Sequence, residues 1–167
     1  RTKQSNPVDG AMVKALEDNG GELLDALDET GKRDDTIVIF TSDNGGLSTG
    51  PAATCNAPLK HGKGWMEEGG IREPLFVVWP GTVTPGSTTD EPVPSTDFYP
   101  TILDMCGLPP VPEQHLDGKS FVPLLKGEPF ERGPIFWHYP HYSNCGGHPG
   151  CSVRDGDYML IRFFEDD

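Results

Sequence analysis

The chain has 167 residues, which is enough for one domain with a hydrophobic core. Its 26 acidic and 13 basic residues give a formal net charge of −13, which argues against nonspecific nucleic-acid binding, because such binding needs a basic surface. Hydrophobic residues make up 35% of the chain, and no uninterrupted apolar run approaches the roughly 20 residues of a transmembrane helix.

The two ends of the chain lack the features of natural termini. The sequence starts with Arg1, has no signal-peptide pattern and stops just after the apolar residues 161–164. We therefore expect a fragment of a longer protein. None of the four cysteines forms a C-x-x-C pair, so a structural zinc site is not expected. Cys145 and Cys151 flank a short Gly/Pro loop, and both a disulfide and two free thiols remain open for them.

The first predicted element is an amphipathic helix from Asp9 to Thr30. Gly31 follows and is suited to the left-handed conformation that ends many helices. Apolar side chains recur at helical spacing along this segment, at Met12, Leu16, Leu23 and Leu27.

A continuous apolar, β-branched run at residues 36–41 predicts a strand covered on both faces, as in a parallel sheet. Asp43 and Asn44 follow the run directly, and two glycines come next. Ligands bind at the carboxyl ends of strands in open α/β sheets, and carboxylate and amide oxygens suit Ca²⁺ or Mg²⁺. The alternative is an Asp-Asn-Gly turn that closes the strand without a metal.

Lys63 lies between two glycines in the next loop, so its ammonium group can approach a ligand closely. With Lys60 and Arg72 it forms a local basic cluster, which can hold an anion whatever the net charge. Two interpretations stay open, namely a ligand contact and an ordinary solvated charge. Acidic residues nearby could also pair with this cluster: Glu67, Glu68 and Glu73.

Further elements follow toward the C-terminus. Residues 75–79 predict a second buried strand, and residues 97–106 predict a helix. Residues 135–139 predict another strand, and an Asp-Gly-Asp turn at 155–157 predicts a hairpin. The expected fold class is therefore α/β, with residues 1–133 in the α/β part. Residues 134–167 are expected to begin a small antiparallel subdomain.

The segment of residues 138–148 is rich in imidazole and hydroxyl groups. Its histidines are His138, His141 and His148. They could bind a metal, but their spacing is irregular, so hydrogen bonding to a polar substrate fits better. Ordinary loop chemistry remains the alternative.

Taken together, these segments strongly resemble the type I, formylglycine-dependent sulfatases of the alkaline-phosphatase-like superfamily. The resemblance rests on "SDNGG", then "GKG" and "EGGIREP", then "STDFYPTILDMCG", in this order. Residues 136–148 and 154–158 look like the C-terminal subdomain of bacterial carbohydrate sulfatases and arylsulfatases. The implied fold is an alkaline-phosphatase-like sheet flanked by helices, with a small C-terminal antiparallel sheet.

The resemblance also implies a function, namely hydrolysis of a sulfate ester on a carbohydrate or aryl group, as in N-acetylgalactosamine-6-sulfatase or arylsulfatase. It implies a Ca²⁺ site with Asp43 and Asn44 as ligands, and Lys63 matches the family lysine that contacts the substrate sulfate. The C-terminal subdomain lies beside the pocket in the family, so the expected sugar contacts are His138, His141 and Arg154. The family implies a periplasmic or secreted protein.

The family nucleophile is a formylglycine made within a C/S-x-P-x-R motif, and this sequence lacks that motif. We therefore expect that the isolated chain neither hydrolyses sulfate esters nor holds Ca²⁺ tightly. Two other functions stay open: a phosphodiesterase or phosphonate hydrolase of the same superfamily, and a non-catalytic glycan-binding relic.

Overall fold

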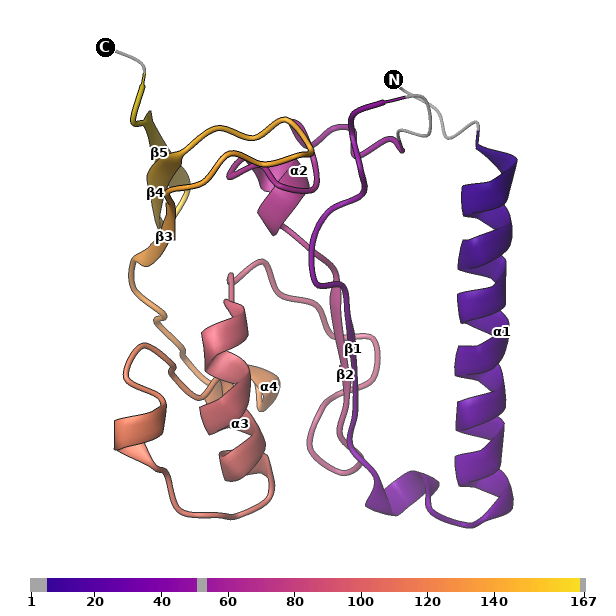
Figure 1. Ribbon diagram of the computed structural model, residues 1–167. Coiled ribbons are helices and arrows are strands. Elements are labelled where there is room, and N and C mark those ends of the chain that lie inside the picture. Colours follow the sequence, from indigo (N-terminus) through magenta and orange to yellow (C-terminus); the bar gives the residue numbers. More distant parts are fainter. Residues whose placement is uncertain (1–5, 51–53, 166–167) are drawn as a thin grey trace.

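The computed structural model describes residues 6–50 and 54–165, and its N-terminal element is a long helix, α1 (Pro7–Glu29). Asn6 caps the helix, because its side chain accepts hydrogen bonds from the backbone N–H groups of Val8 and Asp9. Gly31 ends it with φ of 65°, so the predicted helix and its glycine terminator are confirmed. The helix stands apart from the other elements and buries none of its residues (Figure 1).

A short 3₁₀ turn, η1 (Arg33–Asp35), leads into a two-stranded sheet of β1 (Val38–Thr41) and β2 (Leu75–Val78). The strands are antiparallel, with Val38 opposite Val78 and Thr41 opposite Leu75. The parallel arrangement expected for β1 is therefore wrong for this pair. The connection between the strands, residues 42–74, contains one short helix, α2 (Glu68–Ile71), and folds back on itself so that β2 enters the sheet antiparallel to β1.

The faces of this two-stranded sheet remain partly open. Phe40 and Phe76 lie opposite each other with ring centroids 6.2 Å apart, yet 49% and 61% of these residues are exposed. The expectation that both strands are fully buried is therefore not met among the described residues. The strands are apolar, as the sequence showed, but the described part of the chain has too few elements packed against the sheet to cover both of its faces.

The helical part of the molecule contains α3 (Phe98–Met105) and α4 (Val122–Leu125), with the 3₁₀ turns η2 (Ser95–Asp97) and η3 (Pro112–Gln114). Here the structure buries Phe121 and Met105 together with the polar Asp97 and Thr101. The Thr101 hydroxyl donates to the Asp97 carbonyl and accepts from the Phe121 N–H. These bonds satisfy the buried polar groups and join α3 to the start of α4.

The C-terminal sheet consists of β3 (Ile135–Tyr139), β4 (Gly150–Asp155) and β5 (Tyr158–Phe163). Its order is β3-β4-β5 with antiparallel pairs, so the predicted hairpin and strand are confirmed. Cys145 and Cys151 carry free thiols, which decides between the two alternatives left open for them. No helix within the described ranges is both long and apolar enough to cross a membrane.

Candidate functional site

The segment after β1 is held against the segment that contains Lys63. The Lys63 N–H donates to the Gly46 carbonyl at 3.1 Å, and the Gly45 N–H donates to the Gly70 carbonyl at 3.3 Å. The structure therefore brings the predicted cation ligands Asp43 and Asn44 into the same region as Lys63 through backbone contacts. Figure 1 shows this region between the end of the two-stranded sheet and α2.

Glycines allow this close approach of the two segments. A Cβ atom added at Gly45 would lie 1.7 Å from the Gly69 carbonyl oxygen and 3.2 Å from Oε1 of Glu73. A Cβ at Gly69 would in turn lie 2.3 Å from the His61 carbonyl oxygen. The "GG" pairs of the sequence therefore serve as contact points between backbones, a role for which only glycine is small enough.

Glu73 adds a carboxylate to this region that sequence reasoning assigned only to ion pairing. Its Oε1 atom is buried and has no hydrogen-bond partner in the described part of the chain. Burial and, to a smaller extent, the negative charge of Asp43 raise the pKa of Glu73 above its ordinary value. Glu73 and Asp43 thus place two interacting carboxyl groups in the region after β1.

The residues present fit a hard cation in part. Asp43 is exposed, and the Asn44 amide donates to the Gly45 carbonyl at 3.3 Å, which leaves the amide oxygen to act as a ligand. The buried Glu73 oxygen without a hydrogen-bond partner is a further oxygen atom of the type that a hard cation binds. Within residues 6–50 and 54–165, however, no group of three or more His, Cys, Asp or Glu side chains is arranged to hold a metal. Within the described residues, Asp43 and Asn44 thus do not make a complete cation site.

The three cations of the basic cluster, Lys60, Lys63 and Arg72, differ in whether a carboxylate pairs with them. Lys60 lies 3.2 Å from Oε1 of Glu67, and Arg72 lies 3.6 Å from Oε1 of Glu68, as the alternative interpretation expected for these two cations. Lys63 is exposed, and no carboxylate in the described part of the chain pairs with its ammonium group. Lys63 is therefore the member of the cluster that is available to an anionic ligand.

A hollow of about 550 Å³ lies beside the Lys63 segment. His61 and Trp65 form one wall, and their rings stack with centroids 3.9 Å apart and planes 8° from parallel. The remaining lining is uncharged and includes the hydroxyl groups of Ser48, Thr49 and Thr54. Sequence reasoning did not single out His61 or Trp65, because a ring stack between loop residues leaves no periodic signal.

Arg154 reaches back from the C-terminal sheet to α2. Its Nη1 atom donates to Oε1 of Glu68 at 2.7 Å, and the Arg154 side chain is 21% exposed. The predicted sugar-contacting guanidinium is thus held by a carboxylate of this chain. The contact ties β4 to the element that follows the Lys63 loop.

The three histidines of residues 138–148 occupy different surroundings, and His138 belongs to β3. His138 packs edge-on against Phe164, with centroids 5.8 Å apart, and His141 does so against Tyr139 at 5.6 Å. Both residues are exposed. His148 instead lies 5.9 Å from Trp65, between the C-terminal loop and the wall of the hollow. The histidine in ring contact with the Lys63 segment is therefore His148, whereas the sequence favoured His138 and His141.

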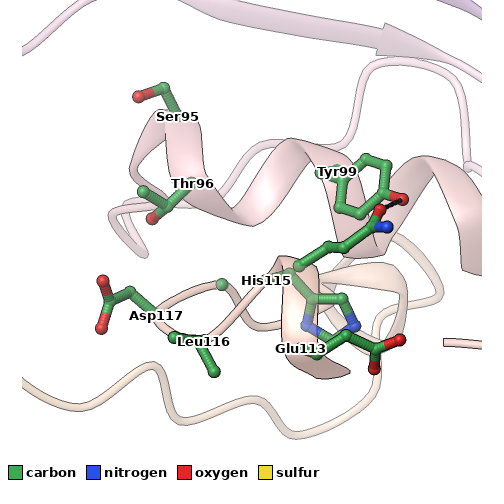
Figure 2. A pocket seen from close by; sticks show the side chains of 9 residues that line it. Ser95, Thr96, Tyr99, Glu113, His115, Leu116 and Asp117 are labelled. Atoms are coloured by element: carbon green, nitrogen blue, oxygen red, sulfur yellow. Dashed lines mark hydrogen bonds between the residues drawn. The ribbon is translucent and has the colours of Figure 1, made fainter. Parts of the chain in front are cut away.

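A second hollow, of about 370 Å³, lies between η2, α3 and the segment around η3. Figure 2 shows Ser95 and Thr96 on one side and His115 with Glu113 on the other. The Tyr99 hydroxyl donates to Oε1 of Gln114 at 2.6 Å and closes one side of the hollow. None of the predicted site residues is among the described residues that line either hollow, and the 550 Å³ hollow is linked to Lys63 only through its chain neighbours His61 and Trp65.

Comparison with known proteins places this geometry in a family. The model of the sulfatase family matches residues 10–108, and the model described as N-sulphoglucosamine sulphohydrolase, C-terminal, matches residues 60–167. The chain therefore belongs to the sulfatase family, in the alkaline-phosphatase-like superfamily, as the sequence motifs predicted.

Individual relatives agree with this assignment. A sulfatase of Formosa agariphila is 38% identical over 94% of this chain and 31% of that protein, and the human N-acetylgalactosamine-6-sulfatase is 36% identical over 77% and 25%. The structure of BT4656 in complex with its substrate D-glucosamine-2-N,6-O-disulfate superposes with a TM-score of 0.78 at 29% identity, covering 93% of this chain and 31% of that one. The chain thus spans between a quarter and a third of the length of these relatives.

Proposed function

We propose that this chain is part of a sulfuric ester hydrolase that acts on sulfated carbohydrate, and that it supplies one half of the active site. Asp43 and Asn44 would be two of the Ca²⁺ ligands, and Lys63 would contact the sulfate. The observation that supports this most directly is the 3.1 Å backbone hydrogen bond between Lys63 and Gly46. This bond joins the segment with the predicted cation ligands to the segment with the predicted sulfate-contacting lysine.

The chemistry follows from the groups present. A bound Ca²⁺ would supply Lewis-acid polarisation of the ester oxygens. The Lys63 ammonium, which is exposed and without an acidic partner in the described ranges, would stabilise negative charge on the transferring sulfuryl group. The nucleophile and the remaining cation ligands would come from the part of the relatives that this chain does not match, so we expect no turnover by the 167-residue chain alone.

A sulfated sugar is the proposed substrate class. The name of N-acetylgalactosamine-6-sulfatase refers to a sulfated amino sugar, and the structure of BT4656 contains its substrate, a sulfated glucosamine. His138 and His141 are exposed and remain candidates for sugar contacts. Arg154 could contact a substrate only by releasing or sharing Glu68. By family analogy, the natural location would be periplasmic or secreted.

A chimera tests the proposal. Residues 6–165 would replace the matching segment of BT4656, and inorganic sulfate released from D-glucosamine-2-N,6-O-disulfate would be measured. We expect turnover, and we expect Lys63→Ala to lower kcat/KM by about 10²- to 10³-fold. Lys14→Ala, in the exposed Lys14–Asp18 pair of α1, is the matched control and should leave kcat/KM unchanged.

An active chimera that tolerates Lys63→Ala would contradict the proposed role of this lysine. Faster cleavage of D-glucosamine 6-phosphate than of the sulfate ester would favour the phosphate-hydrolase alternative. If the chimera does not fold, sulfate can be titrated into the ¹⁵N-labelled 167-residue chain. The amide resonances of residues 43–46 and 62–64 should then shift, and Lys63→Ala should abolish the shift.

A further inference from the structure

His61 is held in a costly backbone conformation. Among residues 6–50 and 54–165, it is the one non-glycine residue with positive φ, at 61°. A side chain with a Cβ atom is strained in this left-handed region. Such residues persist only where the surrounding structure fixes them, and they concentrate at functional sites. The conformation therefore raises the question of what the imidazole does.

Three contacts fix His61 from different directions. The Asn56 amide donates to its carbonyl oxygen at 2.9 Å, and the imidazole stacks on Trp65. On its edge, Nε2 lies 3.6 Å from Oε1 of the buried Glu67. Trp65 is itself anchored, because its indole N–H donates to the Cys145 carbonyl at 3.1 Å. His61 is thus held by its backbone, by one ring face and by the ring edge, although it lies in a loop.

The oriented imidazole faces a hollow rather than solvent alone. His61 and Trp65 line the 550 Å³ hollow, and the His61 side chain is 33% exposed. Glu67 lies on the Nε2 side of the ring, so a ligand hydroxyl that donates to the other nitrogen, Nδ1, would not compete with this carboxylate. The ring therefore offers one flat apolar face and one acceptor nitrogen.

The other groups around the hollow have the same hydrogen-bonding character. The Thr49 hydroxyl donates to the Cys145 carbonyl at 3.3 Å, and the Thr54 hydroxyl donates to the Leu47 carbonyl at 3.1 Å. Both hydroxyl oxygens therefore keep lone pairs that can accept hydrogen bonds. Among the described residues, none that lines the hollow is acidic or a Lys or Arg. A matching ligand would carry no charge on the part that enters the hollow, would have several hydroxyl groups to donate hydrogen bonds, and would have one flat face.

We propose that the hollow is a subsite for a sugar ring, and that His61 is the residue that recognises it. The C–H face of the ring would pack on the imidazole, and a sugar hydroxyl would donate to Nδ1. This inference rests on the proposed sulfatase function and adds to it: the hollow would hold the sugar ring whose sulfate ester contacts Lys63. Lys63 lies two positions after His61 in the chain. Glu67 and Trp65 would act as positioning residues for this contact.

Indole NMR of the ¹⁵N-labelled 167-residue chain can test the subsite. The Trp65 indole N–H resonance would be assigned with Trp65→Phe, since the chain has three tryptophans. D-Glucosamine, which carries no sulfate, should shift the Trp65 indole resonance. Sodium sulfate should instead shift the Lys63 amide resonance. His61→Gly should weaken D-glucosamine binding at least tenfold, and His115→Gly, in the other hollow, should leave it unchanged.

The His61→Gly variant also separates recognition from structure. Glycine adopts φ near 61° without strain, so the melting temperature should stay the same or rise. His61→Asn provides a second variant, because asparagine tolerates this conformation and keeps a polar group. Both variants should fold, and both should bind D-glucosamine more weakly than the unmodified chain.

Unchanged D-glucosamine binding in His61→Gly would overturn the inference, as would a Trp65 resonance that responds to sulfate and not to D-glucosamine. The second result would leave the proposed sulfatase function intact, because sulfate would still bind. A Trp65 shift with D-glucosamine but no response of Lys63 to sulfate would support the subsite and count against the proposed role of Lys63.

Discussion

The guanidinium group of Arg132 is bonded to the fully buried carboxylate of Asp97. Arg132 Nε donates to Oδ2 of Asp97 at 2.6 Å, and Oδ1 accepts from the Lys119 N–H at 2.8 Å. Arg132 Nη2 also donates to the Asp117 carbonyl at 2.8 Å. One ion pair therefore joins the start of α3, the segment before α4 and the segment before β3.

Breaking this pair should destabilise the helical part strongly. Arg132→Ala leaves the Asp97 carboxylate buried without its counter-ion, and we expect a loss of about 3–5 kcal/mol in the free energy of unfolding. Urea unfolding followed by circular dichroism measures it. Arg33→Ala removes an exposed pair with Asp28, 3.5 Å apart, and should cost less than about 1 kcal/mol. Similar losses in the two variants would contradict the structural role of Asp97.

The Glu68–Arg154 contact should couple α2 to the C-terminal sheet. A hydrogen bond to a charged group contributes about 1.5–3 kcal/mol when partly shielded from water. A double-mutant cycle with Glu68→Gln and Arg154→Met should therefore give a coupling energy of about 1–2 kcal/mol. Additive effects would show that the 2.7 Å contact does not persist in solution.

Glycine substitutions should act in opposite directions at two positions. In Gly45→Ala, the new Cβ would meet the Gly69 carbonyl oxygen at 1.7 Å, so we expect a loss of about 1–3 kcal/mol. Gly20 lies within α1 with nothing within 4 Å of an added Cβ, and Gly20→Ala should favour the helix by about 0.5–1 kcal/mol. Helicity at 222 nm and the urea midpoint distinguish the two outcomes, and a neutral Gly45→Ala would argue against the close approach.

Glu73 should make stability depend on pH in a defined direction. Its pKa is raised in the folded chain, so its favourable contribution is complete below the unfolded-state pKa and is lost as pH rises through the folded-state pKa. Glu73→Gln cannot ionise and should be more stable than the unmodified chain near neutral pH. The difference should shrink at about pH 4, close to the ordinary Glu value. Urea titrations at both pH values measure this, and Glu113→Gln, an exposed carboxyl group, is the control.

Calcium should bind weakly to the isolated chain. Asp43 and Asn44 supply two oxygen ligands, whereas Ca²⁺ takes 6–8 as a rule. Isothermal titration calorimetry should therefore show no high-affinity site, and p-nitrophenyl sulfate should not be hydrolysed. Tight Ca²⁺ binding that Asp43→Asn leaves unchanged would place the cation elsewhere in the chain.

Local sequence patterns were sufficient for most of the individual elements. The apolar spacing and the glycine after it predicted α1, and the Asp-Gly-Asp turn predicted the β4–β5 hairpin. The direction of β2 relative to β1 was not predictable in this way. It depends on how the long segment between the strands folds back, and that path is fixed by contacts between glycine backbones.

The candidate site shows the same division between local and non-local information. Asp43, Asn44 and Lys63 were predicted as site residues because each lies in a recognisable motif, and the structure brings their two segments together. The guanidinium of Arg154 was assigned to a substrate, yet it lies 2.7 Å from Glu68, which is 86 positions away in the chain. The Glu73 environment and the His61–Trp65 stack likewise arise from segments that meet only after folding. Charges and rings in loops acquire their partners through tertiary structure, which a single sequence does not encode locally.

The isolation of α1 determines how it should fluctuate. In the 167-residue chain alone, α1 buries none of its residues and so lacks the tertiary packing from which most helical stability in proteins comes. Its amide protons should therefore exchange with deuterium much sooner than those of β4, which is bonded to a strand on either side. The N-terminal segment would fray and re-form many times while the rest of the molecule stays folded.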